Sequence, residues 1–417
     1  MNGISGLQVD LRQLIIAMEA AVSLVGMDDR NHGKRVGYIA SQLGKQLEYS
    51  DEAIAFAFEL GLLHDCGVST AQMHSYLINN FNGNDAQIHC ENGHRLLNGF
   101  KPLAKFATPV LYHHTPWEEL ERTDVSAQVA LMANLIFISD RIDVLAATHS
   151  ETDSSPVSEK VVSSIAKYSG TYFEPSFVWA FKQVAKSEVF WTALEERHVT
   201  CYTRDMGQFD NSRTLNIPQL KQFALLMADI VAQRSPFTDL HSVRVANLAK
   251  YLAVSLGLVK ERCEKIEIAC LLHDLGKRYI PDTIVEQPGT LTDSECAFMK
   301  QCSYETYEIL RHVNGLEDIA SWAAFHHVGL DGVGHPFYPY EKDSRIEARI
   351  IAVADVFQEL VQDRMYQEGM SLNLAIDKLD DLVIKDKLDS KIVILLKQHA
   401  DECFDLAKGQ ELAQCEG

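Results

Sequence analysis

An ordered row of metal-ligand side chains occurs twice along this chain. Each row begins with a single histidine, continues with a His-Asp pair, one further donor and a His-His pair, and ends with an aspartate. The first row is His32, His64, Asp65, His89, His113, His114 and Asp140. The second row is His241, His273, Asp274, Cys302, His326, His327 and Asp355. Corresponding members are 209 to 215 positions apart, and the rows contain nine of the 16 histidines. Duplication of a domain is the simplest cause.

This set of donors favours a multinuclear metal centre. Four or five histidines with two aspartates exceed the ligands of one tetrahedral structural zinc, and imidazole with carboxylate suits Fe, Mn, Zn or Ni. Each row therefore predicts two or three divalent ions per occupied site, with the aspartate of the His-Asp pair bridging two of them. Adjacent metals about 3.5–4 Å apart generate hydroxide and clamp a phosphoryl group, so phosphate-ester hydrolysis is the predicted reaction. A single histidine is more often a satisfied core or surface residue, but an ordered row that repeats favours metal binding.

The elements that must position these donors read as helices. Both rows open with H-x-x-R-V followed by small and apolar residues, and both His-Asp pairs lie in L-L-H-D-x-G. Apolar residues at helical spacing predict one helix over 11–25 and another over 223–231. Strand-like alternation is scarce, so the sequence predicts an all-α fold of two tandem helical domains related by internal duplication.

The chain length of 417 residues fits two domains. We expect the first domain over residues 1–200, a polar linker over 201–218, and the second domain over 219–417. The second half has two segments that the first lacks, 281–291 and 329–343, which are rich in Gly and Pro. Loops on a helical scaffold often carry function.

Composition excludes several classes of protein. A net charge of −20 argues against binding to a DNA or RNA duplex, so an anionic substrate must be held locally by metals and a few cations. No apolar run reaches the roughly 18–20 residues that span a bilayer, and residues 1–10 lack a signal-peptide pattern. We therefore expect no membrane association and a cytoplasmic protein. The nine cysteines lack a paired framework, which predicts reduced thiols.

The motifs resemble those of the HD superfamily of metal-dependent phosphohydrolases, and residues 230–366 resemble its HD-GYP branch of cyclic dinucleotide phosphodiesterases. The motifs that carry this resemblance are, in order, His241-x-x-Arg244-Val245, His273-Asp274-Leu275-Gly276-Lys277, Pro281-Asp282, Pro288-Gly289-Thr290-Leu291-Thr292, His326-His327, Asp331-Gly332-Val333-Gly334-His335-Pro336, Ala348-Arg349-Ile350, and Asp355 with Arg364 and Tyr366. The resemblance implies that Asp274 and Lys277 act in catalysis and that Asp274 bridges metals. It also implies substrate contacts from Lys277, Asp331, Gly334, His335, Pro336 and Arg364.

The chain departs from the family pattern at several positions. Cys302 occupies a position where the family has a histidine ligand, and its thiol is either a Zn or Fe ligand or an inert buried group. The family tyrosine of GYP is His335, giving GHP. In the first half the metal row is complete, but Val68 occupies the position of the catalytic lysine, and Thr115-Pro116-Trp117-Glu118-Glu119 replaces the GYP loop.

These observations predict a phosphodiesterase that hydrolyses a 3′,5′-cyclic dinucleotide, cyclic di-GMP or 3′3′-cyclic GMP-AMP, to a linear dinucleotide. The second domain would be catalytic and the first regulatory. One alternative is a non-catalytic cyclic dinucleotide sensor or scaffold, motivated by Cys302 and His335. Another is a general nucleotide phosphohydrolase that acts through the first domain. A homodimer and a signalling-protein partner both remain open.

Overall fold

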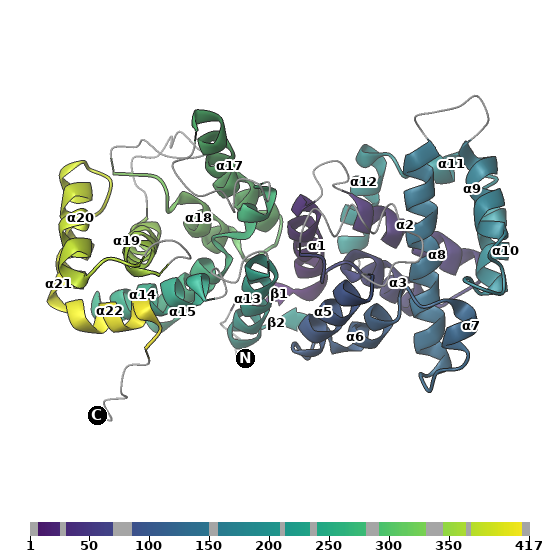
Figure 1. Ribbon diagram of the computed structural model, residues 1–417, viewed down its shortest axis with the longest axis horizontal. Helices are drawn as coiled ribbons and strands as arrows, with labels where there is room; N and C mark the ends of the chain where they lie inside the picture. The colour runs from purple at the N-terminus through teal and green to yellow at the C-terminus, as the bar shows by residue number, and fades with distance from the viewer. Residues whose placement is uncertain are drawn as a thin grey trace, which may run out of the picture. The chain divides into compact units, whose positions relative to one another are not determined.

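The protein is built almost entirely from helices, as the computed structural model shows (Figure 1). The structure describes residues 7–25, 31–69, 86–149, 157–208, 213–233, 240–280, 292–330, 345–363 and 368–410. These residues form two compact units, an amino-terminal unit of residues 11–213 and a carboxy-terminal unit of residues 1–10 and 214–417. The predicted all-α class is confirmed. Among the described helices, none combines the length and apolar character that crossing a bilayer requires.

The amino-terminal unit consists of helices and one 3-10 turn within the described ranges. These are α1 (Leu11–Val22), η1 (Ser23–Val25), α2 (His32–Gln46), α3 (Asp51–Leu63), α5 (Ala86–Asn98), α6 (Ala104–Leu111), α7 (Trp117–Leu120), α8 (Ala127–His149), α9 (Val157–Ala166), α10 (Pro175–Val184), α11 (Glu188–Thr192) and α12 (Glu196–Gly207). Helix α8 is the central helix, because residues 133–143 are buried on all its sides. A helix that is buried all round can hold a polar side chain inside the unit.

The carboxy-terminal unit repeats this plan and adds a short pair of strands. Its elements are β1 (Val9–Asp10), β2 (Thr214–Leu215), α13 (Ile217–Ala232), α14 (His241–Ser255), α15 (Lys260–Leu272), η2 (Leu275–Tyr279), α17 (Asp293–Leu310), α18 (Glu317–Phe325), α19 (Ile346–Val361), α20 (Leu372–Ile384), α21 (Ser390–Gln398) and α22 (Ala400–Lys408). Strand β1 pairs antiparallel with β2, Val9 opposite Leu215 and Asp10 opposite Thr214.

The same helix pairs pack together in both units. Helices α2 and α3 pack against each other as α14 and α15 do, α5 packs on α6 as α17 packs on α18, and α2 contacts α8 as α14 contacts α19. Each pair carries corresponding members of the two metal-ligand rows. The repeat seen in the sequence is therefore also a repeat of local packing.

Local sequence explains where several helices begin and end. Ser50 caps α3 by accepting a hydrogen bond from the Ala53 N–H at 3.3 Å. Asn216 and Gln219 form a reciprocal capping box at the start of α13, which satisfies two N–H groups that the helix cannot pair internally. The helices expected over 11–25 and 223–231 correspond to α1 and α13.

The segment expected as a linker, 201–218, is partly helical. Residues 201–207 lie in α12, and the division between the two units falls between Arg213 and Thr214. Val199, Thr203 and Met206 are the buried residues of α12, spaced four and three positions apart. Because so few residues of this otherwise polar helix are buried, the composition of the segment alone does not indicate a helix.

A buried ion-pair group holds the two ends of the amino-terminal unit together. Arg12 donates from Nε to the Glu59 carboxylate at 2.8 Å, and Arg213 pairs with the same Glu59 oxygen. The Leu11 N–H donates to the Arg213 carbonyl at 2.9 Å. The first and last residues of this unit are thus tied at one point.

Candidate metal centres

Helix ends and two central helices position the histidines and aspartates of both rows. His32 and His241 are the first residues of α2 and α14, and the His-Asp pairs directly follow the last residues of α3 and α15. The His-His pairs follow α6 and α18, and Asp140 and Asp355 lie within α8 and α19. The structure therefore brings most members of each row together, from helix ends and from the interiors of α8 and α19.

The last turn of each helix orients the histidine that follows it. Four histidines place Nδ1 near the backbone carbonyl three residues earlier: His64 on Gly61 at 2.8 Å, His113 on Val110 at 2.6 Å, His273 on Cys270 at 2.5 Å and His326 on Ala323 at 2.5 Å. These carbonyls lack an intrahelical partner at a helix end. Because a carbonyl only accepts, Nδ1 carries the proton, and Nε2 of the neutral ring keeps its lone pair.

In the amino-terminal unit one group of donor atoms is formed by His32, His64 and Asp140, all buried. Nε2 of His32 lies 3.2 Å from Oδ1 of Asp140. Asp65 faces two directions: its Oδ2 lies 3.3 Å from Nε2 of His64, and its Oδ1 lies 3.4 Å from Nε2 of His89. A carboxylate in this position has the geometry to bridge two ions.

The second group of this unit contains His89 and His113. Their Nε2 atoms are 3.2 Å apart, and Nε2 of His113 lies 3.9 Å from Oδ1 of Asp65. His114 is half-buried and packs its ring against both histidines, with centroids 5.1 Å from His89 and 4.3 Å from His113. Among the described residues, His114 does not join a group of converging donor atoms.

Two charged residues beside this row were not singled out in the sequence. Asp143 accepts from Nδ1 of His32 at 2.8 Å and is paired twice with Arg35, at 2.6 Å and 2.9 Å. Arg141 donates to Oδ2 of Asp140 at 3.0 Å from Nε and 2.7 Å from Nη2. A carboxylate on the second nitrogen of a ligating histidine fixes its tautomer and increases its basicity.

The carboxy-terminal unit assembles the equivalent group from His241, His273 and Asp355. Oδ1 of Asp355 lies 3.2 Å from Nε2 of His241 and 3.7 Å from Nε2 of His273, and its Oδ2 lies 3.9 Å from Nε2 of His326. Asp274 reaches both His241 at 3.4 Å and His273 at 3.3 Å through different oxygens.

The remaining donors of this unit differ from their counterparts. His327 forms a group with His326 and Asp355 but is exposed to solvent. His241 directs Nδ1 to Oε1 of Gln358 at 2.6 Å, at the position that Asp143 has in the other unit. Val356 replaces Arg141, so the second oxygen of Asp355 is directed to His326 and not to an arginine.

Lys277 lies directly beside the carboxy-terminal donors. Its Nζ is 2.7 Å from Oδ2 of Asp274. Burial disfavours the charged amine, but the carboxylate of Asp274 outweighs this and raises the pKa of Lys277 above its ordinary value. Lys277 is therefore a cation, and Val68, buried at the corresponding place in the other unit, supplies no charge.

Cys302 is buried, and no group of converging donor atoms among the described residues includes it. Burial raises the pKa of its thiol to about 12, with the Asp274 carboxylate adding to the effect. Backbone packing is tight here, because a Cβ on Gly276 would lie 1.9 Å from the Cys302 carbonyl oxygen. The Gly276 N–H donates to Oγ1 of Thr306 at 2.9 Å, and that hydroxyl donates to the His273 carbonyl at 3.0 Å.

The protonation of the buried histidines differs from ring to ring. Burial lowers the pKa of His273, but the carboxylates of Asp274 and Asp355 outweigh it and raise that pKa to about 9, so this ring must release a proton to bind a metal. Burial lowers the pKa of His89 to about 4 and that of His113 to about 3, so both rings are neutral near neutral pH. Burial alone would raise the pKa of Asp65, but His64 and its neighbours outweigh it and hold the carboxylate ionised.

Buried ring nitrogens provide a test of whether these residues fit a cation. Nε2 of His64, His241, His273 and His326 is buried and has no hydrogen-bond partner within the part of the chain that the structure describes. Oδ1 of Asp65 and Oδ1 of Asp355 are likewise buried and have no hydrogen-bond partner among the described residues. Unpaired buried acceptors are costly, and a divalent ion would satisfy several of them at once. The donor sets therefore fit the metals that the sequence predicts.

Several predicted substrate contacts fall outside the described residues. These are Asp331, Gly334, His335, Pro336 and Arg364. Conversely, sequence reasoning missed Asp143, Arg141, Gln358 and Cys90. One signal was available for two of them, because Asp143 follows Asp140 and Gln358 follows Asp355 by three positions, a spacing that places both on one helix face.

Comparisons with known proteins agree on the kind of fold and chemistry. The sequence profile of the HD domain matches residues 225–392. The 3′3′-cGAMP-specific phosphodiesterase 1 of Vibrio cholerae is 34% identical over 404 residues, which cover 96% of this chain and 94% of that protein. A cyclic di-GMP phosphodiesterase response regulator of Xanthomonas campestris is 36% identical over 152 residues, covering 36% of this chain and 40% of the relative.

A solved structure supports the same fold. A cyclic GMP-AMP-specific phosphodiesterase of Vibrio cholerae superposes with a TM-score of 0.68 at 21% identity, covering 94% of this chain and 98% of that one. Both units and their order therefore have a counterpart in a protein of known structure.

Proposed function

The chain belongs to the HD-domain family of metal-dependent cyclic dinucleotide phosphodiesterases, and from this premise we propose that it hydrolyses 3′3′-cyclic GMP-AMP to a linear dinucleotide. The observation that carries the choice of substrate is likeness to a 3′3′-cGAMP-specific enzyme along both units, whereas the cyclic di-GMP enzyme from Xanthomonas campestris matches only 36% of the chain. Cyclic di-GMP is the competing substrate that the test must include.

We assign turnover to the carboxy-terminal unit and a supporting metal-binding role to the amino-terminal unit. Both units gather imidazole and carboxylate donors, but within the described residues only the carboxy-terminal row has a lysine at the position after H-D-x-G. Val68 cannot neutralise the charge that develops on a phosphate. Among the differences between the two centres, we take this one to divide their roles.

His241, His273, His326, His327, Asp274 and Asp355 would hold the metals of the catalytic centre. Bound divalent ions would supply a hydroxide nucleophile and compensate phosphate charge. Asp355 and Asp274 each direct two oxygens at different histidines, so they keep the donor atoms at fixed separations.

Lys277 contributes what the donors cannot. Hydrolysis forms a bond from a water oxygen to phosphorus and breaks the bond to the 3′ oxygen, which leaves with the electron pair, becomes negatively charged and then takes a proton. The ammonium of Lys277, anchored on Asp274, stabilises that charge and can give the proton. Preorganised charge of this kind lowers the barrier without reorganising during the reaction.

The test is turnover of 3′3′-cyclic GMP-AMP and of cyclic di-GMP by the purified chain supplied with Mn²⁺ or Fe²⁺. Wild type is compared with His64→Ala/Asp65→Ala and with His273→Ala/Asp274→Ala. We expect only the second pair of substitutions to lower the rate of 3′3′-cyclic GMP-AMP hydrolysis, by roughly a hundredfold or more. The reason is that it removes metal ligands that stabilise the transition state by several kcal/mol.

Lys277→Ala separates catalysis from metal loading. It should lower kcat by roughly 10²-fold while leaving the metal content unchanged. Lys260→Ala is the matched control, because Lys260 is exposed in the same unit and, among the described residues, pairs with Glu264 on its own helix. Preference for cyclic di-GMP would refute the substrate, and loss of turnover with the first pair alone would refute the division of roles.

A further inference from the structure

Two buried side chains connect the turn that carries Lys277 to the neighbouring helices. The turn is η2, which packs against α13 and α17. Thr306 is a residue of α17, and Arg278 belongs to the turn itself. Both side chains are completely buried. Neither the metal-ligand rows nor the family resemblance assigns a role to either residue.

The Thr306 hydroxyl bridges two backbone groups that flank Asp274. It accepts a hydrogen bond from the Gly276 N–H at 2.9 Å and donates one to the His273 carbonyl at 3.0 Å. The bridge therefore fixes the backbone on both sides of the Asp274 carboxylate. Lys277 directly follows Gly276, and its Nζ lies 2.7 Å from that carboxylate. One hydroxyl thus holds the backbone of both members of this ion pair.

Arg278 connects the other side of Lys277 to α13. Its Nη1 donates to the Ile230 carbonyl at 2.7 Å. Ile230 lies in the last turn of α13, where carbonyls lack a partner within the helix and where the helix dipole favours a cation. Gly276 and Arg278, the two residues that flank Lys277, are therefore each held by a different helix.

The amino-terminal unit forms the same turn of backbone. The Val68 N–H donates to the Asp65 carbonyl at 2.9 Å, and the corresponding hydrogen bond of the carboxy-terminal unit is also 2.9 Å long. A Cβ on Gly67 would lie 2.0 Å from the His89 carbonyl oxygen, against 1.9 Å at the corresponding glycine. The turn and its close packing on the next helix are therefore common to both units.

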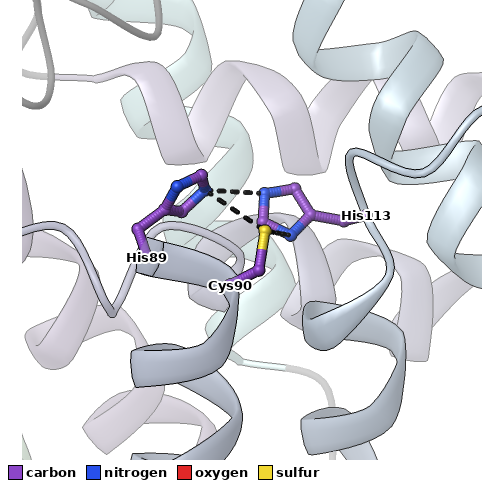
Figure 2. Close-up of side chains that lie close together, drawn as sticks. All are labelled: His89, Cys90 and His113. Atoms are coloured by element: carbon purple, nitrogen blue, oxygen red, sulfur yellow. Dashed lines mark hydrogen bonds between the residues drawn. The ribbon is translucent and has the colours of Figure 1, made fainter. Parts of the chain in front are cut away.

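The side chains of the turn and of the facing helix differ between the units. Val68, Ser69 and Gly93 occupy the positions of Lys277, Arg278 and Thr306. Helix α5 contains no serine or threonine. It directs His89 and Cys90 at His113 instead, with the sulfur 3.7 Å from Nε2 of His89 and 3.6 Å from Nδ1 of His113 (Figure 2). The lysine and both residues that hold its turn are thus absent together from one repeat.

We propose that Thr306 and Arg278 are positioning residues, which hold Lys277 beside the metal ligands of the carboxy-terminal unit. The turn forms in the other unit without either side chain, so their role is to restrict where the turn lies and not to create it. A displacement of about 1 Å costs up to about a hundredfold in rate. This inference rests on the proposed function, because it deepens the role given there to Lys277.

A double-mutant cycle on turnover of 3′3′-cyclic GMP-AMP by the full-length chain with Mn²⁺ is the first test. Thr306→Val should lower kcat by roughly tenfold, with KM and bound metal per chain unchanged. Thr306→Ser keeps the hydroxyl and should restore the wild-type kcat. In the Lys277→Ala background Thr306→Val should cause no further loss, because the two residues act as one unit.

The cycle separates positioning from a general structural role. Rates are compared at a temperature at which every variant is folded. An equal fractional loss with and without Lys277 would overturn the proposal, because it would show that Thr306 acts through the fold or the metals. A wild-type chain that turns over, with Thr306→Val as active as wild type, would also overturn it while leaving the proposed function intact.

Hydrogen exchange of the amides of residues 275–280 tests the proposal without turnover. Exchange should be faster in Thr306→Val and in Arg278→Met, and unchanged in Thr306→Ser, while the amides of 66–69 serve as the control. Arg278→Met remains informative if Thr306→Val fails to fold. Wild-type exchange at 275–280 in both variants, or faster exchange throughout the carboxy-terminal unit, would overturn the proposal. An inactive wild-type chain would contradict only the proposed function, since exchange still reports on the turn.

Discussion

Replacing Asp143 by asparagine should weaken metal binding at the His32 centre by about 5–30-fold. The buried carboxylate accepts from Nδ1 of His32 at 2.8 Å and makes that ring a better donor through Nε2. A hydrogen bond to a charged group contributes about 1.5–3 kcal/mol, against about 0.5–1.5 kcal/mol for a neutral one. The difference of about 1–2 kcal/mol, at 1.4 kcal/mol per tenfold change, gives that range.

The assay is competition between the protein and a chromogenic chelator for Mn²⁺ or Zn²⁺. It uses the His273→Ala/Asp274→Ala background, so that the amino-terminal donors dominate the signal. The chain offers a matched reverse change, because His241 already uses the neutral amide of Gln358 at the corresponding position. Gln358→Glu should tighten binding in the carboxy-terminal unit by a similar factor, measured in the His64→Ala/Asp65→Ala background.

An affinity that changes by less than twofold in Asp143→Asn, with an unchanged Tm, would refute this reasoning. It would mean that Arg35, which makes two hydrogen bonds to Asp143, already cancels the effect of the carboxylate charge on the His32 ring. Metal binding that does not tighten in Gln358→Glu would also contradict it, because the added charge on the partner of Nδ1 should make His241 a stronger metal ligand.

Three further predictions concern stability. Gly276→Ala should destabilise the carboxy-terminal unit by about 1–3 kcal/mol, because the new Cβ would lie 1.9 Å from the Cys302 carbonyl oxygen. The measurement is unfolding by denaturant, and the control is Gly99→Ala, where the nearest atom to the new Cβ is 3.4 Å away. Thr306→Val should cost about 1–3 kcal/mol by leaving the Gly276 N–H without its acceptor, whereas Thr306→Ser should not; equal losses would show that the methyl group matters and not the hydroxyl. Removing metal with a chelator should lower Tm, and a hundredfold excess of metal over Kd should restore about 2.7 kcal/mol; an identical Tm with and without metal would contradict the assignment of the donor groups.

Much of the fold and the site could be predicted from the sequence because the signals are local. A histidine directly after an apolar helix, as at His64 and His273, has only the last-turn carbonyls within reach, and both rings use them. The helical class follows from apolar spacing, and the match between α3 and α15 follows from their common L-L-H-D motif. These features depend on residues close together in the chain.

What the sequence did not reveal depends on side-chain direction and on contacts between distant helices. Cys90 is adjacent to His89, and neighbouring residues on a helix do not face each other, so the convergence of its sulfur with the ring nitrogen was not predictable. Arg141 could equally have been a surface charge, and only burial within α8 pairs it with Asp140. The extent of α12 was hidden because only three of its residues are buried.

The pairing of β1 with β2 has a consequence for how the protein is made and divided. Val9 is synthesised more than two hundred residues before its partner Leu215, so the carboxy-terminal unit cannot complete its fold until Leu215 has been made. A fragment that starts at residue 214 would leave the site of the fully buried Val9 uncovered. Deleting residues 11–213 would instead leave Asp10 and Thr214 opposite each other, where a two-residue hairpin turn could rejoin them into one continuous polypeptide.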